Sequence, residues 1–228
     1  RDVPNRALLK SCELTPDQHD HIKAHCNMLG IEWMASCFDT EAVDLAVALG
    51  AKTIKVGSGE IVNRRLICKI ANAGRALLLS TGACSLEEVR GAFGDFVACD
   101  VRHPYGEIAL LHCVSAYPAA FEDCNLSAID TLKRNFPMCA VGFSDHTIGF
   151  DAAVCAVGAG AEIIERHIML APGCPDEAVS LSPENFRGYV TAIRRAEAMM
   201  GDGEKRVMPG EVEMQKLIRY RWHKEPGS

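Results

Sequence analysis

Short, continuously apolar runs alternate with helical patterns along the whole chain. Six such runs, rich in β-branched and aliphatic residues, occupy positions 31–38, 53–58, 76–81, 108–115, 138–144 and 162–170. A continuous apolar run, in contrast to a strictly alternating one, is typical of a strand that is covered on both faces. Strands that alternate with helices form parallel sheets. The pattern therefore predicts an α/β fold of six βα units.

Capping residues mark the ends of several of the expected helices. Thr15, followed by Pro16, is a suitable N-cap, and Gln18 completes a capping box. Gly30 ends this helix, and Ser85 opens another that has acidic residues in its first turn. Further helices are expected over about 40–49, 63–73, 127–136, 150–158, 183–200 and 211–221. A helix thus follows almost every predicted strand.

Small hydroxyl or charged residues stand at the end of strand after strand. They are Ser36, Ser58, Ser80, Ser115, Ser144 and the group Glu165-Arg166-His167. In a (β/α)₈ barrel the carboxyl ends of the strands converge on one face, where the active site lies. The same ends could serve an open, doubly wound sheet, but no GxGxxG or GxxxxGK motif follows a strand. We therefore predict a TIM-type (β/α)₈ barrel.

Six βα units are two short of a closed barrel. Either two strands precede Arg1 and are absent from this sequence, or the six units form a different, open arrangement. We expect residues 1–200 to form a partial barrel domain and residues 201–228 to form a linker with a helical tail.

The charge balance excludes several classes of partner. The formal charge is −6, and the Lys and Arg residues are scattered rather than clustered. Neither a nucleic acid nor an anionic membrane surface therefore has a basic face to bind. The most apolar stretch, around 152–164, is too short to span a bilayer. An anionic substrate would need a local site.

The number and positions of the cysteines indicate the cellular compartment of the protein. There are eleven, an odd number, no two of them form a CxxC pair, and most lie inside apolar runs such as 111–114. This usage predicts small, buried thiols that are kept reduced. No basic-then-apolar leader begins at Arg1. Both observations predict a cytoplasmic protein.

Lys55 is the sharpest single feature of the sequence. It lies inside an apolar strand, where a buried ammonium group is costly without an anionic partner. The Gly57-Ser58-Gly59 turn allows close backbone approach, and Ser80-Thr81-Gly82 leads into a helix N-terminus at the next strand end. Together they predict an anion cradle suited to a phosphate. The alternative is a lysine that extends to solvent at a strand tip.

Two histidines at adjacent strand ends predict a metal site. His146 follows Ser144 and Asp145, and His167 follows Glu165. Two neutral imidazoles with open positions suit catalytic Mn²⁺, Mg²⁺ or Zn²⁺. A rival cluster, His19, His21 and His25, has no strand-end context, and a solvated helix flank is the better interpretation.

Two loop residues complete the candidate chemistry. Tyr117 and Asp176 follow predicted strands, where polar groups can position a sugar, although both could equally be turn residues.

Five motifs, in one order along the chain, carry a family resemblance. They are Lys55 to Glu60, Leu79 to Gly82, Leu111 to Pro118, Gly142 to Thr147 and Glu165 to His167. Over roughly residues 13–219 the chain resembles the N-acetylneuraminate (sialic acid) synthase family. The resemblance implies a TIM barrel, usually followed by a small antifreeze-like domain, and a homodimer. It implies condensation of phosphoenolpyruvate with N-acetylmannosamine, a related amino sugar or its 6-phosphate, with release of phosphate.

The resemblance also implies roles for residues that match the motifs. Phosphoenolpyruvate would be bound by Lys55, Ser58, Ser80, Ser144 and Ser36. A divalent metal, Mn²⁺ or Mg²⁺, would be ligated by His146 and His167. The sugar would face Tyr117, Ser115 and Asp176. Catalysis would depend on Glu165, Lys55 and Tyr117.

The resemblance has departures, and they leave other functions open. The family's first two strands, with a catalytic glutamate and a second lysine, would precede Arg1, Glu177 stands where many members have histidine, and no antifreeze-like domain follows Trp222. One alternative is a catalytically inactive barrel remnant that binds a partner through its open edge. Another is a metal-dependent lyase or hydrolase built on His146, His167 and Asp145.

Overall fold

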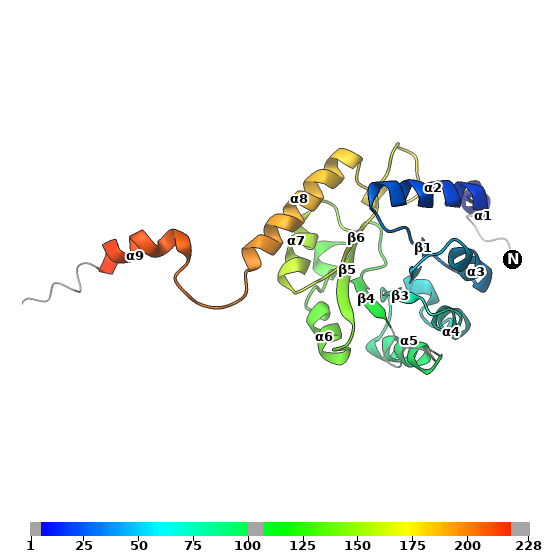
Figure 1. Cartoon of the computed structure of the whole chain (residues 1–228), viewed down its shortest axis with the longest axis horizontal. Coiled ribbons are helices and arrows are strands. Elements are labelled where there is room, and N and C mark those ends of the chain that lie inside the picture. Colours follow the sequence, from blue (N-terminus) through cyan, green and yellow to red (C-terminus); the bar gives the residue numbers. More distant parts are fainter. Residues whose placement is uncertain (1–5, 100–106, 220–228) are drawn as a thin grey trace, which may run out of the picture.

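The chain folds around one parallel sheet of six strands. The computed structural model describes residues 6–99 and 107–219. The strands are β1 (Ala35–Ser36), β2 (Thr53–Val56), β3 (Ala76–Ser80), β4 (Ile108–Cys113), β5 (Ala140–Asp145) and β6 (Ile164–Arg166). Every neighbouring pair is parallel, and the spatial order equals the chain order. The sheet curls into an open half-barrel with helices on its outer side (Figure 1). The predicted α/β barrel-type fold is confirmed, in an incomplete form.

The helices follow the predicted pattern with one addition. They are α1 (Arg6–Ser11), α2 (Pro16–Leu29), α3 (Thr40–Ala48), α4 (Arg64–Asn72), α5 (Leu86–Cys99), α6 (Ala128–Asn135), α7 (Asp151–Gly158), α8 (Pro183–Met200) and α9 (Val212–Arg219). The described residues also form 3₁₀ turns in the connections: η1 (Ser58–Glu60), η2 (Phe121–Asp123), η3 (Glu177–Val179) and η4 (Pro209–Glu211). The short helix α1 was not predicted.

The predicted cap of α2 forms as expected. The Thr15 hydroxyl accepts a bond from the Gln18 amide, and the Gln18 side chain accepts one from the Thr15 amide. Gly30 ends the helix at φ 70°, a left-handed conformation that glycine adopts without steric cost. His21 and His25 are exposed on this helix, in agreement with a solvated flank.

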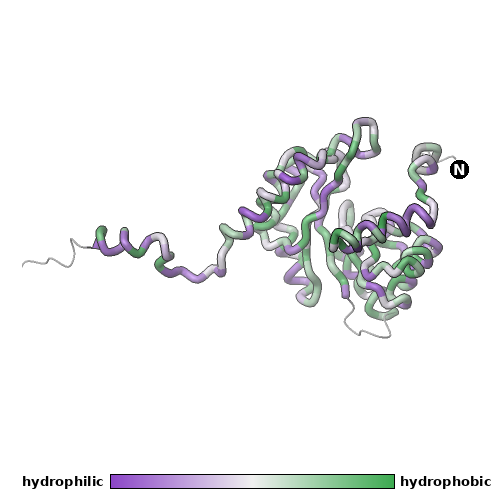
Figure 2. The backbone as a smooth tube through the Cα atoms, turned by 45° about the horizontal axis from the view of Figure 1, so that its top comes forward, coloured by the Kyte–Doolittle hydropathy of each residue, from purple (hydrophilic) through white to green (hydrophobic). Residues whose placement is uncertain are grey.

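The main core lies between the sheet and the outer helices. Ile54, Leu77, Leu79, Leu110 and Val141 come from the strands and are fully buried against helices α3 to α7. Figure 2 shows these strands as largely apolar segments of the tube. A smaller core cluster joins α7 to α8. Burial on both faces explains why the strands are continuously apolar.

One expectation about the cysteines is wrong. Cys68 in α4 and Cys99 in α5 form a disulfide, with their Cα atoms 5.3 Å apart. Cys12 and Cys155 are free and exposed rather than buried. The helical pattern alone does not place Cys68 beside Cys99, because that contact depends on how two outer helices pack.

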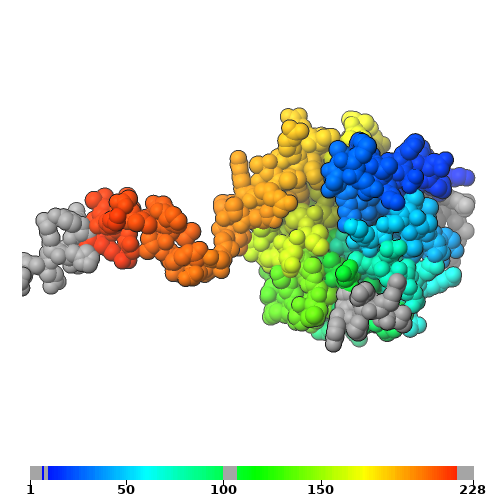
Figure 3. Space-filling view, viewed as in Figure 1, coloured from blue at the N-terminus to red at the C-terminus, as the bar shows by residue number. Residues whose placement is uncertain are grey.

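The C-terminal segment lies apart from the half-barrel. After α8, residues 201–211 lead to α9, which extends away from the main body (Figures 1 and 3) and has no buried residue. The predicted late helix thus begins at Val212 and is described as far as Arg219. Positions 220–228, with Trp222, lie outside the described residues. Within the described ranges, no helix combines the length and apolar composition that crossing a bilayer requires.

Candidate active site

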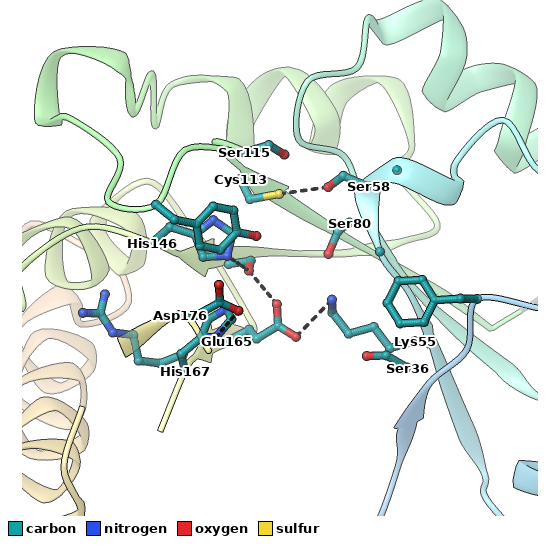
Figure 4. A pocket seen from close by; sticks show the side chains of 16 residues that line it. Ser36, Lys55, Ser58, Ser80, Cys113, Ser115, His146, Glu165, His167 and Asp176 are labelled. Atoms are coloured by element: carbon teal, nitrogen blue, oxygen red, sulfur yellow. Dashed lines mark hydrogen bonds and ion pairs between the residues drawn. The ribbon is translucent and has the colours of Figure 1, made fainter. Parts of the chain in front are cut away.

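A polar cavity opens at the strand ends. It has a volume of about 470 Å³ and lies at the carboxyl end of the sheet (Figure 4). Its lining includes every predicted site residue: Ser36, Lys55, Ser58, Ser80, Ser115, Tyr117, Ser144, His146, Glu165, His167 and Asp176. Parallel strands in register bring these positions together although they are spread over 140 residues of sequence.

Lys55 has a carboxylate partner. Its Nζ lies 3.4 Å from Glu165 Oε1, and the Lys55 side chain is 16% exposed. Ser144 donates a hydrogen bond of 2.5 Å to Glu165 Oε2. Lys55 of β2, Glu165 of β6 and Ser144 of β5 are therefore linked by side-chain contacts across the cavity. The alternative in which Lys55 extends to solvent is wrong.

At the end of β3, next to the strand of Lys55, the Ser80 hydroxyl has unused hydrogen-bonding capacity. Ser80 is 3% exposed, and its hydroxyl has no hydrogen-bond partner within the described residues. Ser58 Oγ accepts a bond of 2.9 Å from the Gly82 amide and lies 3.4 Å from Cys113 Sγ. A buried hydroxyl without a partner costs free energy unless a ligand or water satisfies it. The Ser80 hydroxyl is thus available to bind a ligand in the cavity that Lys55 also lines.

His146 presents one ring nitrogen to the cavity. Its Nδ1 lies 2.8 Å from the Val114 carbonyl oxygen. A carbonyl oxygen only accepts, so Nδ1 must carry the proton. In the neutral ring Nε2 then has a free lone pair, 3.4 Å from Ser144 Oγ. This tautomer is the one in which Nε2 can ligate a metal.

His167 lies next to His146 and is held neutral. The ring centroids are 5.3 Å apart. Burial lowers the pKa of His167, the neighbouring His146 lowers it further, and Asp176 and Glu165 partly oppose the shift. The Asp176 carboxylate is 3.7 Å from His167 Nδ1, which is too long for a hydrogen bond. The two imidazoles therefore face one space.

Tyr117 covers the two imidazoles. Its ring centroid lies 4.2 Å from that of His146 and 5.8 Å from that of His167. Burial raises the pKa of the Tyr117 phenol, and Cys113, Asp176 and Glu165 raise it further. The phenol therefore stays neutral at physiological pH and can donate a hydrogen bond to a polar ligand.

Asp145 does not line the cavity. Its side chain is completely buried behind the site, where it is bonded to Thr147, Arg166 and Tyr189. A lyase or hydrolase that uses Asp145 together with His146 and His167 is therefore not supported.

The sequence and the fold of this chain are similar to those of known proteins. Residues 2–205 match the model of the NeuB family. The chain belongs to the NeuB family. It is 39% identical over 221 residues to the N,N'-diacetyllegionaminic acid synthase of Legionella pneumophila, covering 93% of this chain and 60% of that relative. It is 35% identical over 184 residues to the N-acetylneuraminate-9-phosphate synthase of Drosophila melanogaster, covering 79% of this chain and 48% of that one.

A solved structure is similar to this NeuB-family chain over nearly its whole length. The N-acetylneuraminic acid synthetase of Leptospira borgpetersenii, in complex with citrate, superposes with a TM-score of 0.85 at 29% identity and covers 96% of this chain and 75% of that one. The chain spans between about half and two thirds of the length of the curated relatives it matches.

The donor set fits a divalent metal with open positions. Within the described part of the NeuB-family chain, no group of three or more His, Cys, Asp or Glu side chains is arranged to hold a metal ion. His146 and His167 can supply two nitrogen ligands, and a substrate and water would fill the rest. Such a site is typical of catalytic metals rather than structural ones.

Some cavity residues were not predicted. Phe38 and Cys113 also line the cavity, together with Arg166 from the strand-end group Glu165-Arg166-His167. Phe38 and Cys113 lie two positions from Ser36 and Ser115, so the period of two along a strand could have found them. Their apolar or weakly polar side chains gave no chemical signal in the sequence.

Proposed function

We propose that this NeuB-family chain carries the catalytic half-barrel of a nonulosonate synthase. The reaction would join phosphoenolpyruvate to an N-acetylated amino-sugar aldehyde, N-acetylmannosamine or a related sugar or its 6-phosphate, and release phosphate. The observation that supports it most is the buried Ser80 hydroxyl without a partner beside Lys55. The names of the relatives as synthases of sialic, legionaminic and pseudaminic acids agree with it.

Phosphoenolpyruvate would bind in the part of the cavity that lies between Lys55 and Ser144. The protein carries a formal charge of −6, so a trianionic substrate needs a local cationic site. Lys55 supplies the charge, and the hydroxyls of Ser36, Ser58 and Ser80 supply neutral donors from neighbouring strands. Preorganised donors of this kind also stabilise a departing phosphate. Glu165, which now pairs with Lys55, would lie beside the reacting carbons.

His146 and His167 would hold Mn²⁺ or Mg²⁺. The metal, when bound, supplies a Lewis acid for the sugar aldehyde. The chain's own part is to direct His146 Nε2 to the cavity, through the Val114 carbonyl bond at Nδ1, and to lower the pKa of His167 through burial. Tyr117, Ser115 and Asp176 would orient the sugar next to these rings. The homodimer implied by the resemblance and the cytoplasmic location predicted from the cysteines and the first residues stay predictions.

The first experiment replaces the one lysine of the cavity. We expect Lys55→Ala to lower phosphate release from phosphoenolpyruvate, N-acetylmannosamine and Mn²⁺ by at least a hundredfold, because the substrate loses its cationic partner. Lys52→Ala, three residues earlier on the exposed side of the same segment, is the matched control and should keep full activity. Equal activity of both variants would contradict the proposed role of Lys55.

A second candidate is a binding module without turnover. It rests on the open sheet, in which β1 and β6 each pair on one side only within the described ranges. This function predicts that the parent chain binds phosphoenolpyruvate, that Lys55→Ala weakens binding, and that neither protein releases phosphate. Phosphate release by the parent that requires the sugar would exclude it.

A further inference from the structure

A buried polar network lies directly behind the candidate metal ligands. The Asp145 carboxylate accepts bonds at Oδ1 from the Thr147 amide, at 2.9 Å, and the Thr147 hydroxyl, at 2.8 Å. At Oδ2 it accepts a bond of 2.8 Å from the Tyr189 hydroxyl and pairs with Arg166 Nη1 at 3.0 Å. Asp145 is 0% exposed and the Arg166 side chain 2%. Both oxygens of this carboxylate therefore have partners inside the protein.

The network and the site occupy opposite faces of the same two strands. Ser144 is in register with Glu165, and Asp145 is in register with Arg166. Side chains alternate along a strand, so Ser144 and Glu165 face the cavity while the Asp145 carboxylate lies on the other side. Arg166 reaches the edge of the cavity lining and pairs with Asp145. His146 and His167 follow Asp145 and Arg166 in sequence. One Asp–Arg pair thus fixes the two backbone segments that carry the imidazoles.

Tyr189 connects this pair to α8, a helix that contributes no residue to the cavity lining within the described part of the chain. It lies on α8, 44 residues from Asp145, and is among the largest fully buried side chains. Its ring stacks edge-on against Phe150, at a centroid distance of 5.5 Å, and lies 5.5 Å from the Arg166 guanidinium carbon. The hydroxyl can therefore hardly turn to another partner. A shift of β6 relative to β5 would break its bond to Asp145 or the ion pair.

We infer that Tyr189, acting through the Asp145–Arg166 pair, is a positioning residue that sets the separation of His146 and His167. The inference rests on the proposed function, in which these histidines hold the metal. Partners behind metal ligands often change metal affinity by ten- to a hundredfold when they are removed. Tyr189 does not touch the cavity, so its effect must pass through the two strands.

The test is Tyr189→Phe, which keeps the ring and removes only the hydroxyl. We expect the folded variant to bind Mn²⁺, titrated alone, about tenfold more weakly than the parent, in line with the loss of such a partner. Binding of phosphoenolpyruvate without metal should stay within about threefold, because Lys55 lies on β2, Ser58 in η1 and Ser80 on β3, apart from β5 and β6. Thr191→Val removes an exposed hydroxyl of the same helix, which bonds the Arg187 carbonyl, and should change neither affinity.

The outcomes distinguish an effect of Tyr189 on the histidine positions from an effect on stability alone, and from failure of the proposed function. A lower melting temperature with unchanged Mn²⁺ affinity would overturn the inference. If the parent itself binds no Mn²⁺, the metal proposal fails. The side-chain NMR signals of His146 and His167 then test the positioning alone. Tyr189→Phe should shift both signals, and Thr191→Val should shift neither. Should Tyr189→Phe not fold, Thr147→Val removes one donor from the other carboxylate oxygen and serves the same comparison.

Discussion

At the residue scale, Gly82 is a position where no side chain fits. A Cβ atom there would overlap Ser115 Oγ and lie 2.8 Å from Cys113 Sγ and 3.0 Å from Ser58 Oγ. The Gly82 amide also holds Ser58. We expect Gly82→Ala to displace both serines and to weaken phosphate release by ten- to a hundredfold, because small displacements of binding groups are costly. Phosphate-release kinetics on the folded variant measure this.

Gly94 provides the matched control. It lies within α5 with nothing within 4 Å of an added Cβ. Gly94→Ala should leave activity unchanged and raise the free energy of unfolding by up to about 1 kcal/mol, because alanine favours a helix over glycine. Similar activity losses in both variants would mean that the packing around Gly82 is not the cause of the loss in Gly82→Ala.

The thiols should differ strongly in reactivity. Burial, assisted by Asp39, raises the pKa of Cys37 to about 11. A raised pKa leaves fewer thiolates at any pH below it, so at pH 8 about one Cys37 in a thousand is the reactive thiolate. We expect iodoacetamide to modify the exposed Cys12 and Cys155 first, and Cys37 only on unfolding, as followed by mass spectrometry. Early modification of Cys37 would contradict its burial.

The site residues could be predicted because chemistry and position agree in the sequence. Lys55 interrupts an apolar run, and His146 and His167 stand where strands end, so each carries a signal. Tyr189 carries none, since a tyrosine on the apolar face of a helix resembles any core residue. Its bond to Asp145 depends on how α8 packs, which no local pattern encodes.

At the element scale, α4 and α5 are joined twice. The Cys68–Cys99 disulfide links them, and Arg64 Nε lies 2.8 Å from Asp95 Oδ1. The disulfide closes a loop with a sequence separation of 31, which corresponds to on the order of 3 kcal/mol. We expect a reducing agent to lower the free energy of unfolding by up to that amount in urea titrations. The double variant Cys68→Ser/Cys99→Ser should show no response to the reductant.

Element lengths were harder to predict than element types. The apolar run at 31–38 predicted a full strand, yet only Ala35–Ser36 pairs with β2. An apolar sequence shows that a segment can be buried, but a strand needs neighbours, and β1 has a neighbour on one side only within the described residues. Helix ends were more accurate, because caps such as Thr15 and Gly30 are local.

At the scale of the whole molecule, the half-barrel leaves apolar surface uncovered along its open side. Helix α2 has no buried residue, and Met28, in its last turn, and Ile31, just after it, are 78% and 58% exposed. Beyond β6, Ile168 and Leu170 are also exposed. Six apolar runs in sequence order sufficed to predict the parallel sheet. They did not distinguish a barrel with missing strands from an open arrangement, because both have the same local pattern.

This uncovered surface predicts self-association of the 228-residue chain. Contiguous exposed apolar side chains beside an unpaired strand edge favour contact with another copy. We expect sedimentation velocity to show oligomers that increase with protein concentration, and Met28→Gln/Ile31→Thr to shift the equilibrium toward monomer. Burial of less apolar area in the contact is the physical reason.

The control for that prediction must be equally apolar and equally exposed but lie elsewhere. Met138 and Val62 are each 70% exposed and lie before β5 and before α4, away from the segment between α2 and β1. Met138→Gln/Val62→Thr makes the same two chemical changes and should leave the association unchanged. If both double variants dissociate the oligomers equally, general surface hydrophobicity drives the association. If only Met28→Gln/Ile31→Thr does so, the contact involves the β1 side of the open half-barrel.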